Sequence, residues 1–536
     1  MQAPPSSSPK QRTHLLGSAL LHAVAQNAVW NWAGLAVNTL VGFLLLPYLV
    51  HHLGQTGYGL WILIVSLTSY FSMLDMGVCA AVGRQVAFHL AKDDADGVNA
   101  TFNTALAILL AAGLLAMTGT LLAMPLFFKL FSVPADQIAP VRTSLFLTGI
   151  NLFLWLPLSM ADAMLWAHQR FDVINLIDIP VALGRAVLTV ALVGPRHGLV
   201  ALAIIVLLAQ SGSMALKALM VWHLNPSLRL SPRYLRRQAA RQLLGMGFWN
   251  SLLQLIIVVN GQVGPAIVGS RVAVLMVTPF NIASRLIAYG RDFIVSGTGV
   301  LTPLVISFHA EDKHDKQQQL LLDGGRYATA LAFLFVTIFL VLGQPIIRLW
   351  MHQDVPFAST ALLLLILGEA LPMSQWVSYS IILGKYHHRE LAVASVIENA
   401  IAIALALIFV RHWGLLGVCV GFAIPATLCR GLFWLIYACR LVKVSPWRYG
   451  LSVLLPVLSA GLLPALTLWH VVHRSPPRTW PHLLMDVALY SLAYLASLAL
   501  LFARAWYRRG QPRQADVPQL PDATTRALIG TLEAER

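Results

Sequence analysis

The stretch "GYGLWILIVSLTSYFSMLDMGVCAAVGRQ" at residues 57–85 decides the fold class of this chain. Its first 18 residues carry no charged side chain, and a run of that length can cross a hydrocarbon core about 30 Å thick. Asp75 and Arg84 follow near its end, where a helix would reach the aqueous interface. We therefore expect a membrane-spanning helix, with Asp75 capping or pairing locally and Arg84 in a cytoplasmic extension.

The composition extends this conclusion to the whole chain. The mean hydropathy is +0.71, 58% of the residues are hydrophobic and 11% are charged, whereas soluble domains are about 25% charged. Long apolar runs recur from end to end, so we predict an all-α polytopic membrane protein with about fourteen transmembrane helices. The predicted spans are roughly 27–50, 58–81, 103–127, 142–166, 173–194, 198–222, 246–268, 272–303, 327–349, 359–383, 391–410, 414–440, 450–472 and 483–504.

Basic residues predict the orientation. With the N-terminus inside, cytoplasmic segments up to residue 513 hold 22 Lys and Arg residues and outside loops hold 8, which favours two cytoplasmic termini. The same bias explains the net charge of +15, because inner-leaflet lipids attract basic segments. We therefore expect no nucleic-acid partner. The segment 229–244 spaces arginines at i, i+4 and i+8 and is interpreted as an interfacial amphipathic helix.

An internal repeat predicts the domain organisation. "VWNW" at 29–32 resembles "FWNS" at 248–251, and "NLIDIPVAL" at 175–183 resembles "SVIENAIAI" at 395–403. The offset of about 220 residues spans six helices, so the two copies have the same orientation, as in two-lobed transporters. The predicted parts are a cytoplasmic tail (1–26), an N-lobe of helices 1–6 (27–222), a basic cytoplasmic linker (223–245), a C-lobe of helices 7–12 (246–440), a two-helix C-terminal appendage (441–504) and a disordered tail (505–536).

Charges near the middle of predicted spans are candidate functional residues. An ionisable group at that depth usually faces a bundle interior or a watery cavity. The alternative is local ion pairing at i, i+7, between Asp178 and Arg185 or between Arg285 and Asp292. The span 272–303 carries three charges and is interrupted by Pro279 and Gly290, which favours a wall of an aqueous path. The full mid-membrane set is Arg185, Arg285, Arg291, Arg430, Asp178, Asp292, Glu369 and Glu398.

The region 42–87 resembles a known family. Its "GFLLLPYLVHHLGQTGYGLW" contains a proline that ends the first span and an "LG..GYGLW" turn, and "LDMG" follows near the end of the second span. The "G..G" rhythm of "GLLGVCVG" at 414–421 also fits. This pattern resembles the polysaccharide-export flippases of O-antigen and exopolysaccharide synthesis. Their superfamily also contains multidrug and toxin extrusion antiporters and the lipid II flippase.

The resemblance implies a function and a place. It implies a bacterial inner-membrane transporter that flips an undecaprenyl-diphosphate-linked oligosaccharide to the outer leaflet by alternating access, beside membrane lipids and with a polysaccharide polymerase and a chain-length regulator as candidate partners. A cavity arginine can hold a diphosphate through paired N–H groups, and amides such as Asn27 and Gln254 suit a sugar. The expected substrate-binding residues are Arg285, Arg291, Asp292, Asn31, Asn38 and Arg185.

Two alternatives stay open. A cation-coupled drug antiporter of the same superfamily would need a dominant cavity acid, whereas the mid-membrane set is mixed and basic in the span 272–303. A membrane polymerase or glycosyltransferase would need catalytic residues in large outside loops, which are short here, so we expect no enzyme activity. No cofactor or metal is expected. If H⁺ or Na⁺ drives transport, the coupling-ion candidates are Asp178, Glu369 and Glu398.

Overall fold

The computed structural model describes the backbone of residues 9–75, 77–194, 198–299 and 301–507. Side chains are not described at 9–33, 72, 246–257, 299 and 504–507. Within the described ranges every regular element is a helix. The predicted all-α class is therefore confirmed, while the predicted disorder beyond 507 and the side chains of Asn27, Asn31 and Gln254 lie outside the described residues.

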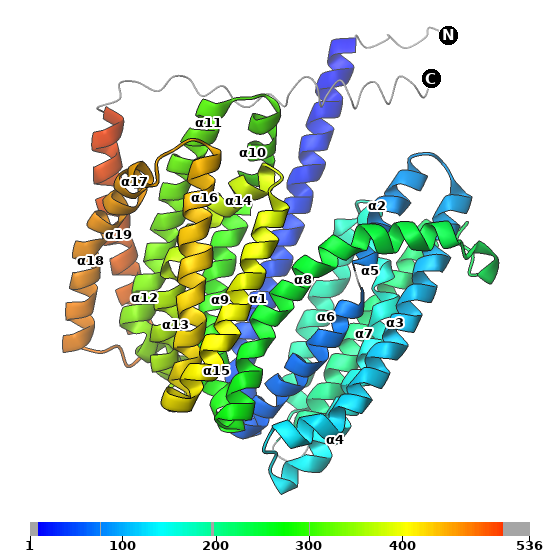
Figure 1. The fold of residues 1–536 in the computed structure, drawn as a ribbon, viewed down its shortest axis with the longest axis horizontal. Helices are drawn as coiled ribbons and strands as arrows, with labels where there is room; N and C mark the ends of the chain where they lie inside the picture. The colour runs from blue at the N-terminus through cyan, green and yellow to red at the C-terminus, as the bar shows by residue number, and fades with distance from the viewer. Residues whose placement is uncertain (1–8, 76, 195–197, 300, 508–536) are drawn as a thin grey trace. The chain divides into compact units, whose positions relative to one another are not determined.

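The chain divides into two compact units, Met1–Asn281 and Ile282–Arg536. Unit 1 holds α1 to α8, and in Figure 1 its helices α3, α4 and α7 lie side by side, in agreement with their packing contacts. The bounds are α1 Pro9–Ser72, α2 Val78–Leu90, α3 Ala95–Leu130, α4 Ile138–Leu158, α5 Met160–Ala167, α6 Phe171–Leu192, α7 Gly198–Leu224 and α8 Arg237–Arg271, with 3₁₀ turns at Met73–Asp75, Ala135–Gln137, Pro232–Tyr234 and Val274–Met276.

Unit 2 begins within α9 and is organised around α12, α13 and α15, with α18 packed on α12 and α19 (Figure 1). The helices are α9 Val277–Gly299, α10 Leu301–Ala310, α11 His314–Gln319, α12 Gly325–Met351, α13 Ala358–Ser374, α14 Trp376–Gly384, α15 His388–Ala426, α16 Trp434–Leu441, α17 Pro446–Tyr449, α18 Leu455–Arg474 and α19 Trp480–Tyr507. Three π-helical segments, at Leu320–Gly324, Thr427–Phe433 and Gly450–Leu454, interrupt this order. The predicted lobe boundary at 223–245 stays a prediction.

The number of spans is roughly consistent with fourteen. Within the described residues, ten helices are long and apolar enough to cross a membrane, and a bent pair formed by α13 and α14 raises this to eleven. The segments Gly34–Leu90 and His388–Leu441 are 57 and 54 residues long, more than twice the roughly 20 residues that one span needs. Each contains a glycine with non-helical backbone, Gly54 at φ 70° and Gly414 at φ 55°.

The "LDMG" motif is a helix break. Met73–Asp75 forms a 3₁₀ turn and Gly77 has φ 65°, a left-handed conformation that glycine adopts readily. The next helix, α2, starts at Val78, and Asp75 Oδ1 accepts a hydrogen bond from the Cys79 backbone N–H at 3.2 Å. The local capping role predicted for Asp75 is confirmed.

Glycines in "GLLGVCVG" allow a tight helical hairpin at Gly414. A Cβ on Gly417 would lie 2.2 Å from the Phe409 carbonyl oxygen, and one on Gly421 would lie 2.5 Å from the Ala406 nitrogen. The two halves of α15 thus approach closely through small residues, as is common for helices packed in membranes.

Two local expectations were wrong. Pro47 lies inside α1 and does not end it, and the backbone is non-helical at Gly54 instead. The segment 229–244 is not one amphipathic helix. Residues 229–236 contain only the 3₁₀ turn Pro232–Tyr234, and α8 begins at Arg237. Pro232 cannot donate a helical hydrogen bond, which disfavours a regular helix through this segment.

Candidate functional site

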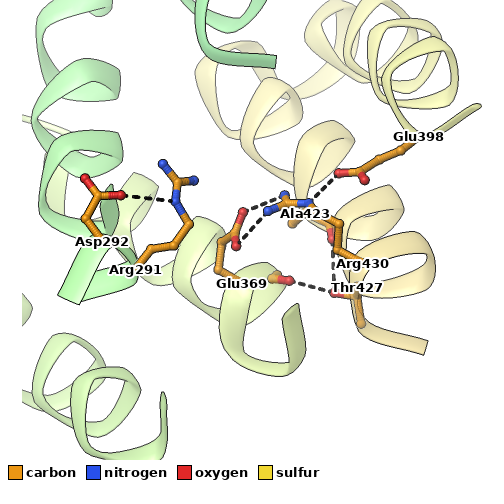
Figure 2. Close-up of polar contacts among 8 residues, drawn as sticks. Arg291, Asp292, Glu369, Glu398, Ala423, Thr427 and Arg430 are labelled. Carbon is orange, nitrogen blue, oxygen red and sulfur yellow. Dashed lines mark hydrogen bonds and ion pairs between the residues drawn. The ribbon is translucent and has the colours of Figure 1, made fainter. Parts of the chain in front are cut away.

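A buried arginine joins three helical segments of unit 2. Arg430 lies in the π-helical segment Thr427–Phe433, Glu369 on α13 and Glu398 on α15. The guanidinium donates to Glu369 through Nη2 at 2.7 Å and Nη1 at 3.1 Å, and to Glu398 through Nε at 2.7 Å (Figure 2). Paired N–H groups on one carboxylate form a strong and geometrically specific contact. We call these three residues the unit 2 triad.

The backbone around the triad explains how the residues meet. A Cβ on Gly368 would lie 2.4 Å from the Ala423 Cβ, so only glycine lets α13 approach the second half of α15 this closely. Thr427 Oγ1 donates to both the Gly368 and the Ala423 carbonyl oxygens at 3.0 Å. These contacts hold Glu369, the residue after Gly368, beside the π-helical turn that carries Arg430. Such π-helical turns occur frequently at functional sites.

The triad is buried and carries unequal charges. The side chains of Arg430, Glu369 and Glu398 are 15%, 14% and 5% exposed. Two carboxylates and one guanidinium leave a formal charge of −1, and a buried charge is stable only when it is paired. Arg291 on α9 supplies the second positive charge, because it is close enough to Glu369 to interact with it electrostatically. Figure 2 shows Arg291 on the side of Glu369 away from Glu398.

Arg291 is the more accessible cation of this group. Its side chain is 36% exposed, and its Nε lies 3.8 Å from Asp292 Oδ1, which is an ion pair rather than a hydrogen bond. Asp292 therefore pairs with Arg291, and the alternative of an i, i+7 pair between Asp292 and Arg285 was wrong. Arg285 is exposed on α9 and interacts with Tyr289 electrostatically. The guanidinium of Arg291 has more N–H groups than this one ion pair uses, and a guanidinium can bind a phosphate group through such donors.

Unit 1 contains a comparable triad. Lys217 on α7 is 2% exposed, and its Nζ donates to Asp162 Oδ1 on α5 at 2.7 Å and to Asp178 Oδ2 on α6 at 2.8 Å. Ser213 Oγ, one turn from Lys217, also donates to Asp178 at 2.7 Å. Lys217, Asp162 and Asp178 form the unit 1 triad, in which one cation again joins two carboxylates from different helices.

The unit 1 triad corrects one expectation and supplies two missed residues. Asp178 pairs with Lys217 on the neighbouring helix, so the alternative of a local pair with Arg185 was wrong. Sequence analysis did not single out Lys217 or Asp162. A signal was available, because Lys217 lies in the apolar span 198–222 and Asp162 in the span 142–166, where any charge needs a partner.

The remaining predicted residues with described side chains, Arg185 and Asn38, are not members of either triad. Arg185 is half-buried on α6, and its carbonyl oxygen accepts from Thr189 Oγ1 at 2.7 Å. Asn38 is exposed on α1 and donates to the Gly34 carbonyl oxygen at 3.0 Å. Among the described residues, no group of three His, Cys, Asp or Glu side chains could hold a metal ion.

Comparisons with known proteins place these features in context. Residues 24–309 match a family model described as "Polysaccharide biosynthesis protein". A Shigella flexneri protein described as a candidate O-antigen transporter is 33% identical over 67 residues, which span 12% of this chain and 16% of that relative's length.

Solved structures share the fold. The lipid II flippase MurJ, in an inward closed conformation, matches with a TM-score of 0.66 and 15% identity, covering 90% of this chain and 100% of that one. An inward-facing multidrug resistance MATE family transporter of the MOP superfamily matches with a TM-score of 0.65 and 16% identity, covering 76% of this chain and 96% of that one. At these identities the likeness concerns the fold alone.

Proposed function

Since this chain belongs to the polysaccharide biosynthesis protein family, we propose that it flips an undecaprenyl-diphosphate-linked oligosaccharide from the inner to the outer leaflet by alternating access. The family match, the multi-pass helical fold and the flippase fold of MurJ support this proposal together. A bacterial inner-membrane location with cytoplasmic termini, and a polymerase and chain-length regulator as partners, belong to the same proposal.

The observation that carries the proposal is the different bonding of two cations in unit 2, Arg430 and Arg291. Arg430 donates three hydrogen bonds to Glu369 and Glu398, whereas Arg291 makes a longer ion pair with Asp292 and interacts with Glu369 electrostatically. We infer that Arg291 is the phosphate contact and that the diphosphate displaces Asp292 from it. Arg430 instead holds Glu369 in place, so that Arg291 keeps its position when the cargo leaves.

The same geometry weakens the antiporter alternative. A cationic drug needs an available carboxylate, but Asp178, Glu369 and Glu398 each already bond a cation of their own unit. Coupling of transport to H⁺ or Na⁺ through these acids requires that a triad opens during the transport cycle, because each carboxylate must leave its cation to bind the ion. A polymerase or glycosyltransferase activity is the weaker alternative, because the relatives named above are transporters and flippases.

Export of surface glycan tests the function and the site together. Deletion of the protein should abolish surface glycan and accumulate lipid-linked intermediates on the cytoplasmic side. Arg291→Ala should reproduce the deletion at matched membrane levels, Arg291→Lys should restore export in part, and Arg285→Ala should reduce it less. Normal surface glycan in the deletion strain with new sensitivity to cationic drugs would replace this proposal with the antiporter.

A further inference from the structure

Two buried asparagines and a threonine on α3 hold the segment that follows α7. Asn99 and Asn103, one turn apart, are 3% and 7% exposed, and Thr104 is 4% exposed. Asn99 Nδ2 donates to the Ser227 carbonyl oxygen at 3.1 Å, and its Oδ1 accepts from the Arg229 N–H at 2.7 Å. The side chain of Asn99 thus bonds the chain at two points.

Asn103 repeats this pattern further along the segment. Its Nδ2 donates to the Arg229 carbonyl oxygen at 2.8 Å, and its Oδ1 accepts from the Ser231 N–H at 2.9 Å. Thr104 Oγ1 then accepts from the Arg236 N–H at 3.2 Å. Side chains of α3 therefore bond backbone groups of residues 227, 229, 231 and 236, which a regular helix would pair internally.

The fixed backbone directs basic side chains outward. The arginines at 229, 233, 236, 237 and 241 are all exposed, and Leu230 and Leu235 between them are 55% and 49% exposed. We call residues 227–241 the arginine strap. The acidic side chain of Asp94 interacts electrostatically with Arg236.

We propose that the arginine strap is a docking surface for the headgroups of anionic phospholipids, with its arginines held in register by Asn99 and Asn103. Charge complementarity argues for this occupant, since arginine binds phosphate oxygens through paired N–H groups. The exposed leucines argue for a membrane rather than a soluble anion, because apolar side chains beside basic ones are typical of interfacial segments. The strap also begins three residues after Leu224, where the span α7 ends.

This proposal goes beyond transport and can fail independently of it. A Leu235→Cys variant carries a bimane label in full-length protein reconstituted into phosphatidylcholine vesicles. The four native cysteines are buried or half-buried, which favours labelling at position 235. Brominated phosphatidylglycerol should quench the label at a mole fraction at least about fivefold lower than the mole fraction of brominated phosphatidylcholine that gives equal quenching. A fivefold factor corresponds to the attraction of one basic residue to an anionic membrane surface. Equal quenching by the two lipids would overturn the proposal.

Matched variants separate the strap from general positive charge. Arg233, Arg237 and Arg241→Gln should abolish the preference for phosphatidylglycerol. Arg389, Arg440 and Arg448→Gln, which remove three exposed arginines from unit 2, should leave it unchanged. An equal loss in both triple variants would show that net charge alone is responsible and would overturn the proposal.

The positioning role of the asparagines has its own test. Asn99→Leu with Asn103→Leu keeps every arginine but removes four of the hydrogen bonds that fix the backbone. The preference of this double variant for phosphatidylglycerol over phosphatidylcholine should fall several-fold. A preference equal to that of the unsubstituted protein would overturn the positioning role of the asparagines. If this variant fails to fold, Asn103→Leu alone provides the same comparison.

Discussion

Asp178 and Glu398 occupy the same place in the two units, each bonding a buried cation from a later helix of its own unit. Asp178 accepts from Lys217 at 2.8 Å and Glu398 from Arg430 at 2.7 Å. The two carboxylates are also aligned in the internal repeat, within "NLIDIPVAL" and "SVIENAIAI". The carboxylate thus stands at matching positions of the two predicted repeat copies, and its partner is a lysine in unit 1 and an arginine in unit 2.

Removing Lys217 should destabilise the protein through unpaired aspartates. Breaking a fully buried ion pair costs roughly 3–5 kcal/mol. Because Asp162 and Asp178 are 36% and 37% exposed, we expect about 2 kcal/mol for Lys217→Met after solvent screening. Denaturant unfolding in detergent measures this change. Adding Asp162→Asn and Asp178→Asn should restore much of the stability. Lys129→Met, at an exposed site on α3, is the control, and an equal effect there would contradict the prediction.

Arg430→Lys should weaken the unit 2 triad although the charge is retained. A lysine ammonium cannot present the fork that reaches Glu369 and Glu398 simultaneously. Losing at least one charge-assisted hydrogen bond should reduce the free energy of unfolding by about 1.5–3 kcal/mol. Thermal unfolding in nanodiscs provides the measurement, with Arg448→Lys at an exposed position as the matched exchange. Unchanged stability of Arg430→Lys would mean that the fork geometry is dispensable.

Two glycine substitutions should act in opposite directions. Gly421→Ala places a Cβ 2.5 Å from the Ala406 backbone nitrogen, and such overpacking typically costs about 1–3 kcal/mol. Gly212 lies within α7 and a Cβ there meets nothing within 4 Å, so Gly212→Ala should stabilise its helix by up to about 1 kcal/mol. Unfolding both variants and the unsubstituted protein under identical conditions gives the sign of each change in the free energy of unfolding. Two changes of the same sign would contradict the packing argument.

Acid should loosen the start of α3. Asp94 Oδ1 accepts from the Gly97 N–H at 2.8 Å and Oδ2 contacts His89 Nδ1 at 2.8 Å. The Gly97 hydrogen bond, with help from His89 and Arg236, lowers the pKa of Asp94. The contribution of Asp94 to the stability of the fold is therefore fully present above its unfolded pKa of about 3.9. This contribution is lost as the pH falls through the lower folded pKa.

Amide hydrogen exchange at residues 95–98 should report this loss. Protection, corrected for the intrinsic pH dependence of exchange, should decrease below about pH 4 in the native protein. Asp94→Asn can still cap the helix but cannot titrate, so its corrected protection should stay constant over the same range. A parallel decrease in both proteins would assign the effect to another group.

The sequence alone was sufficient for several conclusions, because they depend on composition and local spacing. The length of an apolar run predicts a membrane span whatever the neighbouring helices are, so the membrane class and an approximate number of helices followed from the sequence. The local capping role of Asp75 was also predicted, since it acts within one helical turn, although the predicted span 58–81 ran through the break at Gly77. The mid-membrane charges Glu369, Glu398 and Arg430 could likewise be identified, although not as one group.

Only the tertiary structure decided which charges meet. Spacing i, i+7 places Asp178 and Arg185 on one face of α6 and made their pairing plausible, but it says nothing about the adjacent helix. Packing of α6 against α7 and α5 brings Lys217 between Asp178 and Asp162, and a short contact with a buried ammonium outweighs a pairing two turns away. The same holds for the first part of the arginine strap, where arginine spacing suggested a helix and the buried amides of Asn99 and Asn103 on α3 bond the backbone of residues 227–231 instead. Helix-to-helix neighbours are set by the shape of whole packed surfaces, which no local pattern of residues contains.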